Sequence, residues 1–465
     1  MSKDLSRRTF LKDLGIGLAA ATSIGSLANI TFAQSNVGIE EIDWGDTVEE
    51  VEERVLSGPY ELPSNWEKAV EGVDKIRAFN YGSLDPWDPA TLEAGRIFEE
   101  KTGVEVEYLA VPRLQMRPKE VSMLSARSDA VDILQADFSL IKDYQAANWL
   151  ADLTPLFPEG TWDHYTPGTK NLCKIDGQTW AVSQFGRVRL FLYNKEIFSE
   201  AGLDPENPPR DWNELNEAIK KLDETMPSGQ NPYLSAFSGE EPPQIAWTSS
   251  LYQAGGRVIQ PDGMVQYNTE EGIQAQRHWT EMIEEGLLPN RVFSLTEGGM
   301  SDSFNAGEVG CMSMMSFAVP RAIEAFGKEK IGVATEPGAP TQGGENATML
   351  DSDQVAVNPF GNKKAAAALY ADFIRSYEHQ KNEIVIEGNI SHLPKVFEDP
   401  EVKEKLPFYD TYREAMEKGF LESHRMQQTT YHYIAQYVVN GMKGQHSPEE
   451  AMNKLQDQVD QLLGY

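Results

Sequence analysis

The chain has few of the residues that build metal or redox sites. Its 465 residues include two cysteines, Cys173 and Cys311, and seven scattered histidines, with no C-x-x-C and no H-x-x-x-H pair. No G-x-G-x-x-G, P-loop or G-x-S-x-G motif occurs either. We therefore expect two separate thiols, no cofactor, no metal ion and no catalytic residue.

Basic charge and long apolar runs are also scarce. The formal net charge is −31, and such a surface repels nucleic acid and anionic lipid, so we exclude both as partners. Beyond the N-terminal region, no segment approaches the roughly 18 apolar residues that span a bilayer. The composition is that of a soluble globular protein with room for two or three domains, and we expect a monomer.

The N-terminus carries an export signal. Arg7 and Arg8 lie in the run SRRTFLK, a twin-arginine motif, and a weakly apolar Gly/Ala-rich segment follows over residues 14–28. Small residues at the right spacing predict cleavage near Ala33. We interpret residues 1–33 as a twin-arginine signal peptide and expect a periplasmic mature protein.

Residues 34–72 form an acidic, helix-prone N-terminal extension, in which Thr47 is a candidate helix N-cap. Alternating residues then predict strands at 75–81, 104–108 and 131–134, with helices between them. Strands separated by helices of this size indicate βαβ units and a largely parallel sheet, and therefore the α/β class.

Residues 177–203 are the most distinctive stretch. Two apolar runs, 180–182 and 190–193, predict strands, and Asn194 is placed to cap a helix after them. The intervening residues 183–189 are polar and contain Gly186, Arg187 and Arg189. This composition suits a chain that passes from one packed core to another.

Four segments, in this order along the chain, resemble the solute-binding proteins of ABC importers, in the sugar-binding family that includes maltose-binding protein. The segments are FEEKTGVEV at 98–106, LADLT at 150–154, the signature from Asp176 to Trp212, and FNAGEVGCM at 304–312. Together they cover about residues 75–440. The chain departs from the family pattern at Ser183, where proline is common, and at Asp211, where Thr or Ser is usual.

The resemblance implies a type II periplasmic binding protein fold, in which two α/β lobes are joined by a hinge and close over a ligand in the interlobe cleft. On this basis the first lobe comprises residues 73–185 and 353–397, and the second comprises residues 190–350 and 400–465. The three crossings, where the chain passes from one lobe to the other, are expected at 183–189, 351–358 and 393–400.

The first lobe offers four candidate ligand-binding residues at the carboxyl ends of its parallel strands, where α/β clefts bind ligands: Tyr81, Asp85, Trp87 and Asp137. The resemblance also assigns a ligand contact to Asp137. The alternative for Asp137 is an N-cap of the helix that follows it.

Arg187 lies at the predicted first crossing, where the family often has a ligand-contacting polar residue, and its alternative role is an interlobe salt bridge. Trp247 and Phe317 are candidate ring contacts from the second lobe, with burial in its core as the alternative. The methionines at 312, 314 and 315 indicate an apolar strand and not a copper site.

The resemblance therefore predicts a receptor that binds a sugar, oligosaccharide, polyol or glycerol phosphate and delivers it to an ABC permease. A secreted glycan-processing hydrolase is the alternative. A redox protein exported in folded form is less well supported, because no cofactor motif occurs. The two arginines of the crossing suggest an acidic ligand, whereas the net charge gives no steering toward anions.

Overall fold

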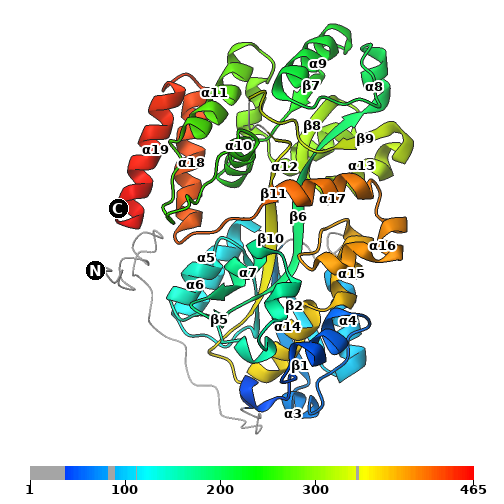
Figure 1. The fold of residues 1–465 in the computed structure, drawn as a ribbon, viewed down its shortest axis with the longest axis vertical. Coiled ribbons are helices and arrows are strands. Elements are labelled where there is room, and N and C mark those ends of the chain that lie inside the picture. The colour runs from blue at the N-terminus through cyan, green and yellow to red at the C-terminus, as the bar shows by residue number, and fades with distance from the viewer. Residues whose placement is uncertain (1–36, 82–88, 112, 342–344) are drawn as a thin grey trace, which may run out of the picture.

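The computed structural model describes residues 37–81, 89–111, 113–341 and 345–465 (Figure 1). The predicted signal peptide and two predicted site residues, Asp85 and Trp87, lie outside the described residues. Figure 1 shows two lobes, one above the other, with two long strands running between them. The two lobes and the strands between them agree with the expected two-lobed α/β arrangement.

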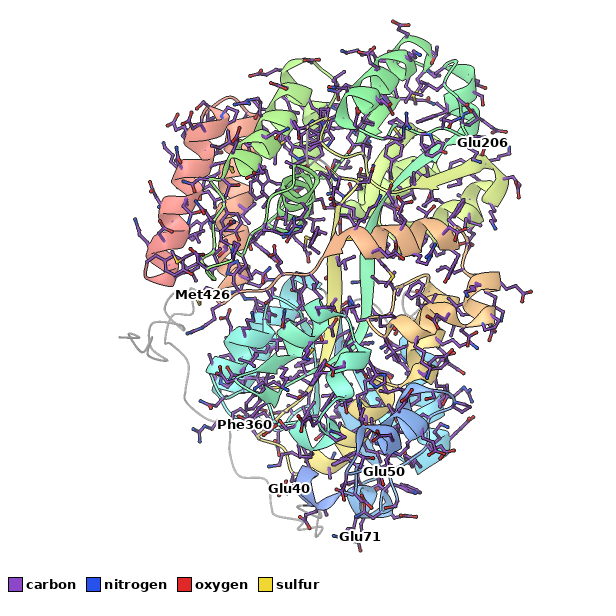
Figure 2. All side chains as sticks on the ribbon, in the orientation of Figure 1. Glu40, Glu50, Glu71, Glu206, Phe360 and Met426 are labelled. Carbon is purple, nitrogen blue, oxygen red and sulfur yellow. The ribbon has the colours of Figure 1, made fainter. Side chains whose placement is uncertain are left out.

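The N-terminal extension is part of the first lobe. Thr47 caps α2 (Val48–Val51) through its hydroxyl, as predicted, and η2 (Glu52–Leu56) and α3 (Glu67–Val70) follow. Val51, Val55 and Leu56 are fully buried. The segment packs on α14 (Lys364–Ile374) and α15 (Tyr377–Glu387), and Figure 2 places the exposed Glu40 and Glu71 at the end of the first lobe farthest from the second.

The first lobe contains the predicted βαβ units. Strand β1 (Lys75–Tyr81) pairs in parallel with β2 (Glu105–Val111) and with β3 (Ile133–Asp137). Helices α4 (Pro89–Thr102) and α5 (Arg113–Ser125) connect them. The remaining short elements are α6 (Ile141–Ala146), α7 (Pro167–Cys173), β4 (Lys174–Ile175) and β5 (Gln178–Thr179).

Residues 182–194 form one strand of 13 residues, β6 (Val182–Asn194), and not the two strands predicted. The polar middle stays extended because strand β10 (Thr348–Val357) pairs with it from Val182 to Val188. The prediction of a largely parallel sheet was also only partly correct, since β10 runs antiparallel to both β3 and β6. A chain that returns from the other lobe enters the sheet from the opposite end, which reverses its direction.

The second lobe continues the same sheet, in the order β2-β1-β3-β10-β6-β8-β7. Its strands are β7 (Asn231–Leu234), β8 (Val309–Met315) and β9 (Ile331–Ala334), and β8 is fully buried, as its methionines predicted. Its helices are α8 (Lys195–Glu200), α9 (Trp212–Thr225), α10 (Glu241–Gln253), α11 (Glu270–Glu284), α12 (Glu297–Asn305), α13 (Ala318–Phe326), α18 (Gln427–Met442) and α19 (Pro448–Leu463).

The chain passes between the lobes a third time near helix α16. Helix α16 (Pro400–Lys405) is still attached to the first lobe, because Lys381 of α15 forms ion pairs with Asp399 and Glu401. Helix α17 (Tyr409–Lys418) reaches the second lobe, where the Tyr412 hydroxyl donates to the Ser316 carbonyl oxygen at 3.3 Å. By these contacts the chain passes from the first lobe to the second between Lys405 and Tyr409.

Both cysteines are free thiols and both are buried, Cys173 in the first lobe and Cys311 in the second, so the expectation of two separate thiols is confirmed. Among the described residues, no helix is both long and apolar enough to cross a bilayer. The described part of the chain also contains no group of His, Cys, Asp or Glu arranged to hold a metal ion.

Candidate functional site

The site is built around the point where β6 changes partners. Val188 is the last β6 residue that pairs with β10, and Arg189 is the first that pairs with β8. On the other edge of β6, Gly186 exchanges two backbone hydrogen bonds with Ile390, at 2.8 and 2.7 Å. Three backbone segments therefore lie side by side here: β10, β6 and the chain at Ile390, which still belongs to the first lobe.

Gly186 is required by this close approach. A Cβ atom at this position would lie 2.4 Å from the His392 ring nitrogen and 3.0 Å from the Asp351 carbonyl oxygen. Both distances are well below van der Waals contact. The glycine noted in the polar middle of the sequence thus allows the third segment to lie against β6.

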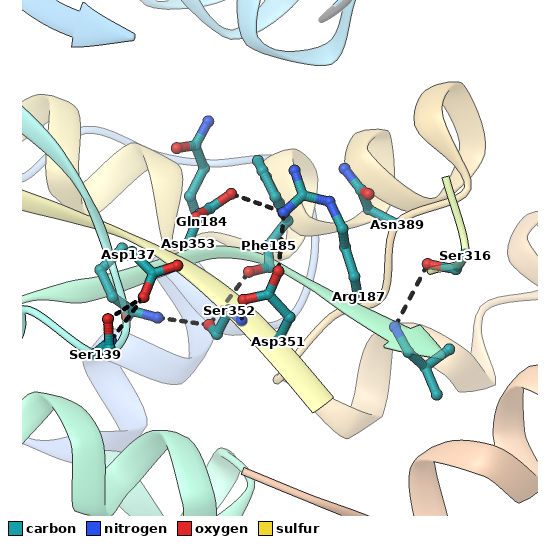
Figure 3. A network of polar contacts seen from close by, with 12 residues as sticks. Asp137, Ser139, Gln184, Phe185, Arg187, Ser316, Asp351, Ser352, Asp353 and Asn389 are labelled. Atoms are coloured by element: carbon teal, nitrogen blue, oxygen red, sulfur yellow. Dashed lines mark hydrogen bonds and ion pairs between the residues drawn. The ribbon is translucent and has the colours of Figure 1, made fainter. Parts of the chain in front are cut away.

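Arg187 is held by two carboxylates of the neighbouring strand (Figure 3). Its Nη1 lies 3.2 Å from Asp351 Oδ2 and 3.0 Å from Asp353 Oδ2, both on β10. Its guanidinium also covers the Phe185 ring at 4.5 Å, and only 15% of its side chain is exposed. The salt-bridge alternative is therefore realised, but within the crossing itself and not from one lobe to the other.

Asp137 lies at the end of β3, facing the second lobe. Its Oδ1 accepts the Ser139 backbone N–H at 2.9 Å and also the Ser139 hydroxyl, which fixes the turn before α6. Gln428 of α18 donates to Ser139 Oγ at 2.6 Å and approaches Asp137 Oδ1 at 3.5 Å. Asp137 therefore has a local turn role, as its alternative proposed, and also lies where the two lobes meet.

Tyr431, one turn farther along α18, was missed by the sequence reasoning. Burial raises the pKa of Tyr431 well above its ordinary value, and the negative charges of Asp137, Asp351 and Glu241 raise it further. Tyr431 lines a small cavity with Gln244 and Thr248 of α10 and with Met349 and Leu350 of β10, so this face of α18 lies beside the crossing. The available signal was the polar run QQTTY at the start of a predicted helix.

Phe317 follows the end of β8, next to the crossing. The neighbouring Ser316 hydroxyl accepts the Val188 N–H at 3.5 Å, and the Phe317 ring is half-buried beneath the Arg321 guanidinium at 5.1 Å. Burial lowers the pKa of Arg321, whereas the charges of Glu387 and Asp302 act in the opposite direction. Phe317 thus occupies a position that is compatible with its predicted role.

Trp247 does not line an open surface. Its side chain is fully buried in α10 and packs at 5.8 Å from the Tyr267 ring, so we assign it to the core of the second lobe. The alternative of core burial is the one the structure supports, because apolar neighbours enclose the ring. Tyr81 ends β1, at the carboxyl edge of the parallel strands, and its side chain lies outside the described part of the structure.

A second group of contacts joins the lobes beside Asp137. Both oxygens of the Asp143 carboxylate accept the Met426 backbone N–H, at 3.0 and 3.2 Å, at the start of α18. Lys142 donates to the Ser423 carbonyl oxygen. These two contacts and the Gln428–Ser139 hydrogen bond connect residues 139–143 of the first lobe to the N-terminal end of α18 in the second lobe.

Comparison with known proteins agrees with this arrangement. A model of the bacterial extracellular solute-binding protein family matches residues 81–381. A probable amino-acid ABC transporter periplasmic-binding protein of Sinorhizobium fredii is 23% identical over 99% of this chain and 98% of its own length. An arabinooligosaccharide-binding protein of Halalkalibacterium halodurans is 22% identical, over 84% of this chain and 90% of its own.

Solved structures share the fold. The structure of T. maritima MalE3 with bound maltose superposes with a TM-score of 0.74 at 23% identity, covering 83% of this chain and 99% of that chain. Since the family model matches well over half of the chain, the family assignment expected from the four sequence segments is confirmed. The protein belongs to the family of bacterial extracellular solute-binding proteins.

Proposed function

We propose that this protein is the periplasmic receptor of an ABC importer and that it captures a carbohydrate or a related polyol between its two lobes. The observation that carries the proposal is the meeting of polar groups from both lobes at the crossing: Gln428 of α18 donates to Ser139 beside Asp137, and Arg187 lies between Asp351 and Asp353. Planar carboxylates and an adjacent ring suit a ligand rich in hydroxyl groups, because each buried hydroxyl left unpaired costs about 1–3 kcal/mol. The half-buried Phe317 ring adds an apolar face for the C–H surface of a sugar.

The family and the printed names of its relatives support this proposal. One relative is named an arabinooligosaccharide-binding protein, and one structural neighbour contains maltose. Another relative is named a probable amino-acid binding protein, so amino acids are the competing ligand class. Within this proposal the ligand-binding residues are Tyr81, Asp85, Trp87, Asp137, Arg187 and Phe317, joined by Gln428 and Tyr431.

A ligand screen tests the proposal. Purified mature protein is heated with sugars, oligosaccharides, polyols and amino acids, and hits are confirmed by calorimetric titration. A ligand at 100 times its Kd raises the free energy of unfolding by about 2.7 kcal/mol, which a thermal scan detects. We expect saturable, one-to-one carbohydrate binding without product. Binding of amino acids alone would contradict the ligand class, and Asp137-dependent release of product from oligosaccharides would support a hydrolase.

Export and delivery complete the proposed function. Residues 1–33 direct twin-arginine export with cleavage near Ala33, and the closed, ligand-loaded monomer docks on an ABC permease. Replacing Arg7 and Arg8 with lysine is expected to keep the protein in the cytoplasm as the uncleaved precursor. Fractionation and N-terminal sequencing measure this, and unchanged export of the double variant would contradict the route.

A further inference from the structure

The charge of Arg187, which suggested an anionic ligand at the level of sequence, is already compensated. Its guanidinium lies 3.2 Å from Asp351 and 3.0 Å from Asp353, and the side chains of these acids are 9% and 0% exposed. All three groups lie on one face of the paired strands β6 and β10 (Figure 3). Burial raises the pKa of Asp353 well above its ordinary value, so Asp351 is the carboxylate that balances the guanidinium, and the cluster carries no net positive charge for a ligand.

Arg189, the second arginine of the crossing, is directed into the second lobe. Its Nε lies 3.3 Å from Glu336 Oε1, and only 4% of each side chain is exposed. Its Nη2 donates to Ser235 Oγ at 3.0 Å and to the Ser313 carbonyl oxygen at 3.3 Å. Arg189 is thus a buried structural group that a ligand in the cleft does not reach.

Arg321 is the third arginine of this region, and it too has acidic neighbours. Burial lowers the pKa of Arg321, the charges of Glu387 and Asp302 act in the opposite direction, and the charge of Arg187 lowers the pKa further. Its guanidinium covers the Phe317 ring.

The other described residues of the site also favour a ligand that carries no negative charge. The carboxylates of Asp137, Asp351 and Glu241 all act on Tyr431. The N-terminal end of α18, which would otherwise attract an anion, is capped by the Asp143 carboxylate at Met426. Phosphate and carboxylate ligands are normally held by unpaired arginines or by free helix N-termini.

We infer that the interlobe site takes a polyhydroxylated ligand that is uncharged or carries an amine, and that it discriminates against the phosphorylated and carboxylated forms of the same ligand. This inference rests on the proposed function. An anion that approaches Arg187 meets Asp351 and Asp353, which already hold the guanidinium, and it gains Arg187 only by competing with them. Discrimination against anionic ligands therefore comes from Asp351 and Asp353, the carboxylates of the crossing that pair with Arg187.

Series of ligands matched except for charge test the inference. Glucose, glucosamine, glucuronate and glucose 6-phosphate form one series, ribitol and ribitol 5-phosphate a second, and glycerol and glycerol 3-phosphate a third. The carbohydrate hit of the broader screen is added with its amino and acidic derivatives. Affinities are measured by calorimetry at pH 7.5 and fixed ionic strength. In the series that binds, we expect each anionic member to bind at least tenfold more weakly than the neutral one.

Asp351→Asn tests whether the acidic partners of Arg187 cause the discrimination against anions, because the variant leaves Arg187 with a single acidic partner. We expect the ratio of neutral to anionic affinity to fall at least threefold in this variant, with near-ultraviolet circular dichroism confirming its fold. Asp129→Asn, an exposed carboxylate of the first lobe, is the matched control and is expected to keep the wild-type ratio. An unchanged ratio in Asp351→Asn would overturn the assignment of selectivity to this cluster.

The wild-type series decides the inference even if Asp351→Asn does not fold. Equal or tighter binding of an anionic member overturns the inference and leaves the proposed carbohydrate receptor standing. Failure of every carbohydrate to bind, in any charge state, overturns the proposed function and with it the inference.

Discussion

Asp143 in the first lobe caps Met426 at the start of α18 in the second lobe, with both carboxylate oxygens within 3.2 Å of the Met426 nitrogen. The contact makes the relative position of the lobes dependent on a titratable group. Burial raises the pKa of Asp143 from 3.8 to about 6, although the Met426 N–H and the charges of Arg425 and Arg117 act against that rise. The neighbouring Lys142 is also affected, since burial lowers its pKa.

Closure of the lobes is therefore expected to depend on pH. When the lobes separate, Asp143 regains water and its pKa returns toward 3.8, so the closed form binds more protons between pH 4 and 6. Below pH 4 the protonated carboxyl stabilises the closed form relative to the open form by its full amount. This stabilisation is lost as the pH rises to about 6. The ratio of closed to open protein changes by up to about a hundredfold, since one pKa unit corresponds to a factor of about ten. Fluorescence energy transfer between dyes on the two lobes measures the ratio of closed to open protein.

Asp143→Asn separates this effect from other titrations. The amide cannot ionise and still accepts the Met426 N–H, so we expect the variant to stay closed across pH 4 to 6. The control Asp129→Asn removes an exposed carboxylate of the same lobe and should retain the wild-type pH dependence. A parallel slope in both variants would exclude Asp143 as the titrating group.

Removal of Arg187 is expected to destabilise the crossing. Arg187→Ala leaves Asp351 and Asp353 side by side in a nearly dry environment, and breaking a buried pair in this way costs about 3–5 kcal/mol. Urea unfolding followed by circular dichroism measures the free energy of unfolding. Adding Asp353→Asn to Arg187→Ala removes one of the stranded charges and should recover part of the loss. A double variant no more stable than the single one would show that the acids are not stranded charges.

Local sequence signals predicted most of the secondary structure. The three parallel strands of the first lobe and the caps Thr47 and Asn194 depend on neighbours within a few residues, and all are present. The antiparallel entry of β10 was not predictable in this way. It depends on residues 133–137 meeting residues 353–357, more than 200 positions away, and no local pattern encodes the direction in which the chain returns.

The candidate site shows the same division. Asp137 and Arg187 were found because they lie in or after a strand of recognisable pattern. Gln428 and Tyr431 were missed because their role arises only when α18 lies against the first lobe, about 290 positions earlier in the chain. Trp247 was placed among the ring contacts because composition does not distinguish an aromatic ring in a cleft from one in a core.

Both thiols are expected to resist modification in the native state. Burial raises the pKa of Cys173 and of Cys311 far above the ordinary value, so almost no thiolate is present at neutral pH. Treatment with iodoacetamide at pH 8 should leave the mass of the native protein unchanged, and in denaturant it should add two carbamidomethyl groups. Modification of either cysteine at the same rate in both states would contradict the burial.

Trp247→Phe is expected to lower stability without a selective effect on ligand binding. The ring is fully buried beside Tyr267, and the smaller side chain leaves a cavity that costs about 1–3 kcal/mol. The Kd for carbohydrate should remain within about threefold of wild type, because the ring reaches no ligand. Trp66→Phe, at a half-buried site in the N-terminal extension, is the control for loss of an indole. A tenfold loss of carbohydrate affinity at unchanged stability would show that Trp247 contacts the ligand.

The N-terminal extension is expected to stabilise the first lobe through a buried charge network. Arg54 Nη1 lies 2.6 Å from Asp372 Oδ2, which also accepts the Tyr60 hydroxyl at 2.9 Å, and Asp372 pairs with Arg375 at 2.7 Å. Burial alone raises the pKa of Asp372, but Arg54 and Arg375 outweigh it and hold that pKa below its ordinary value.

Arg54→Ala removes one of the two cations and is expected to lower the free energy of unfolding by about 3 kcal/mol, near the lower end for broken buried pairs because Arg375 remains. Arg96→Ala is the matched control: its pairs with Glu93 and Glu100 are exposed, and exposed pairs of this kind contribute little to stability. No residue of the Arg54–Asp372–Arg375 network belongs to the candidate site, so carbohydrate affinity is expected to be unchanged in both variants. Equal stability of the two variants would mean that the extension rests on the lobe without stabilising it.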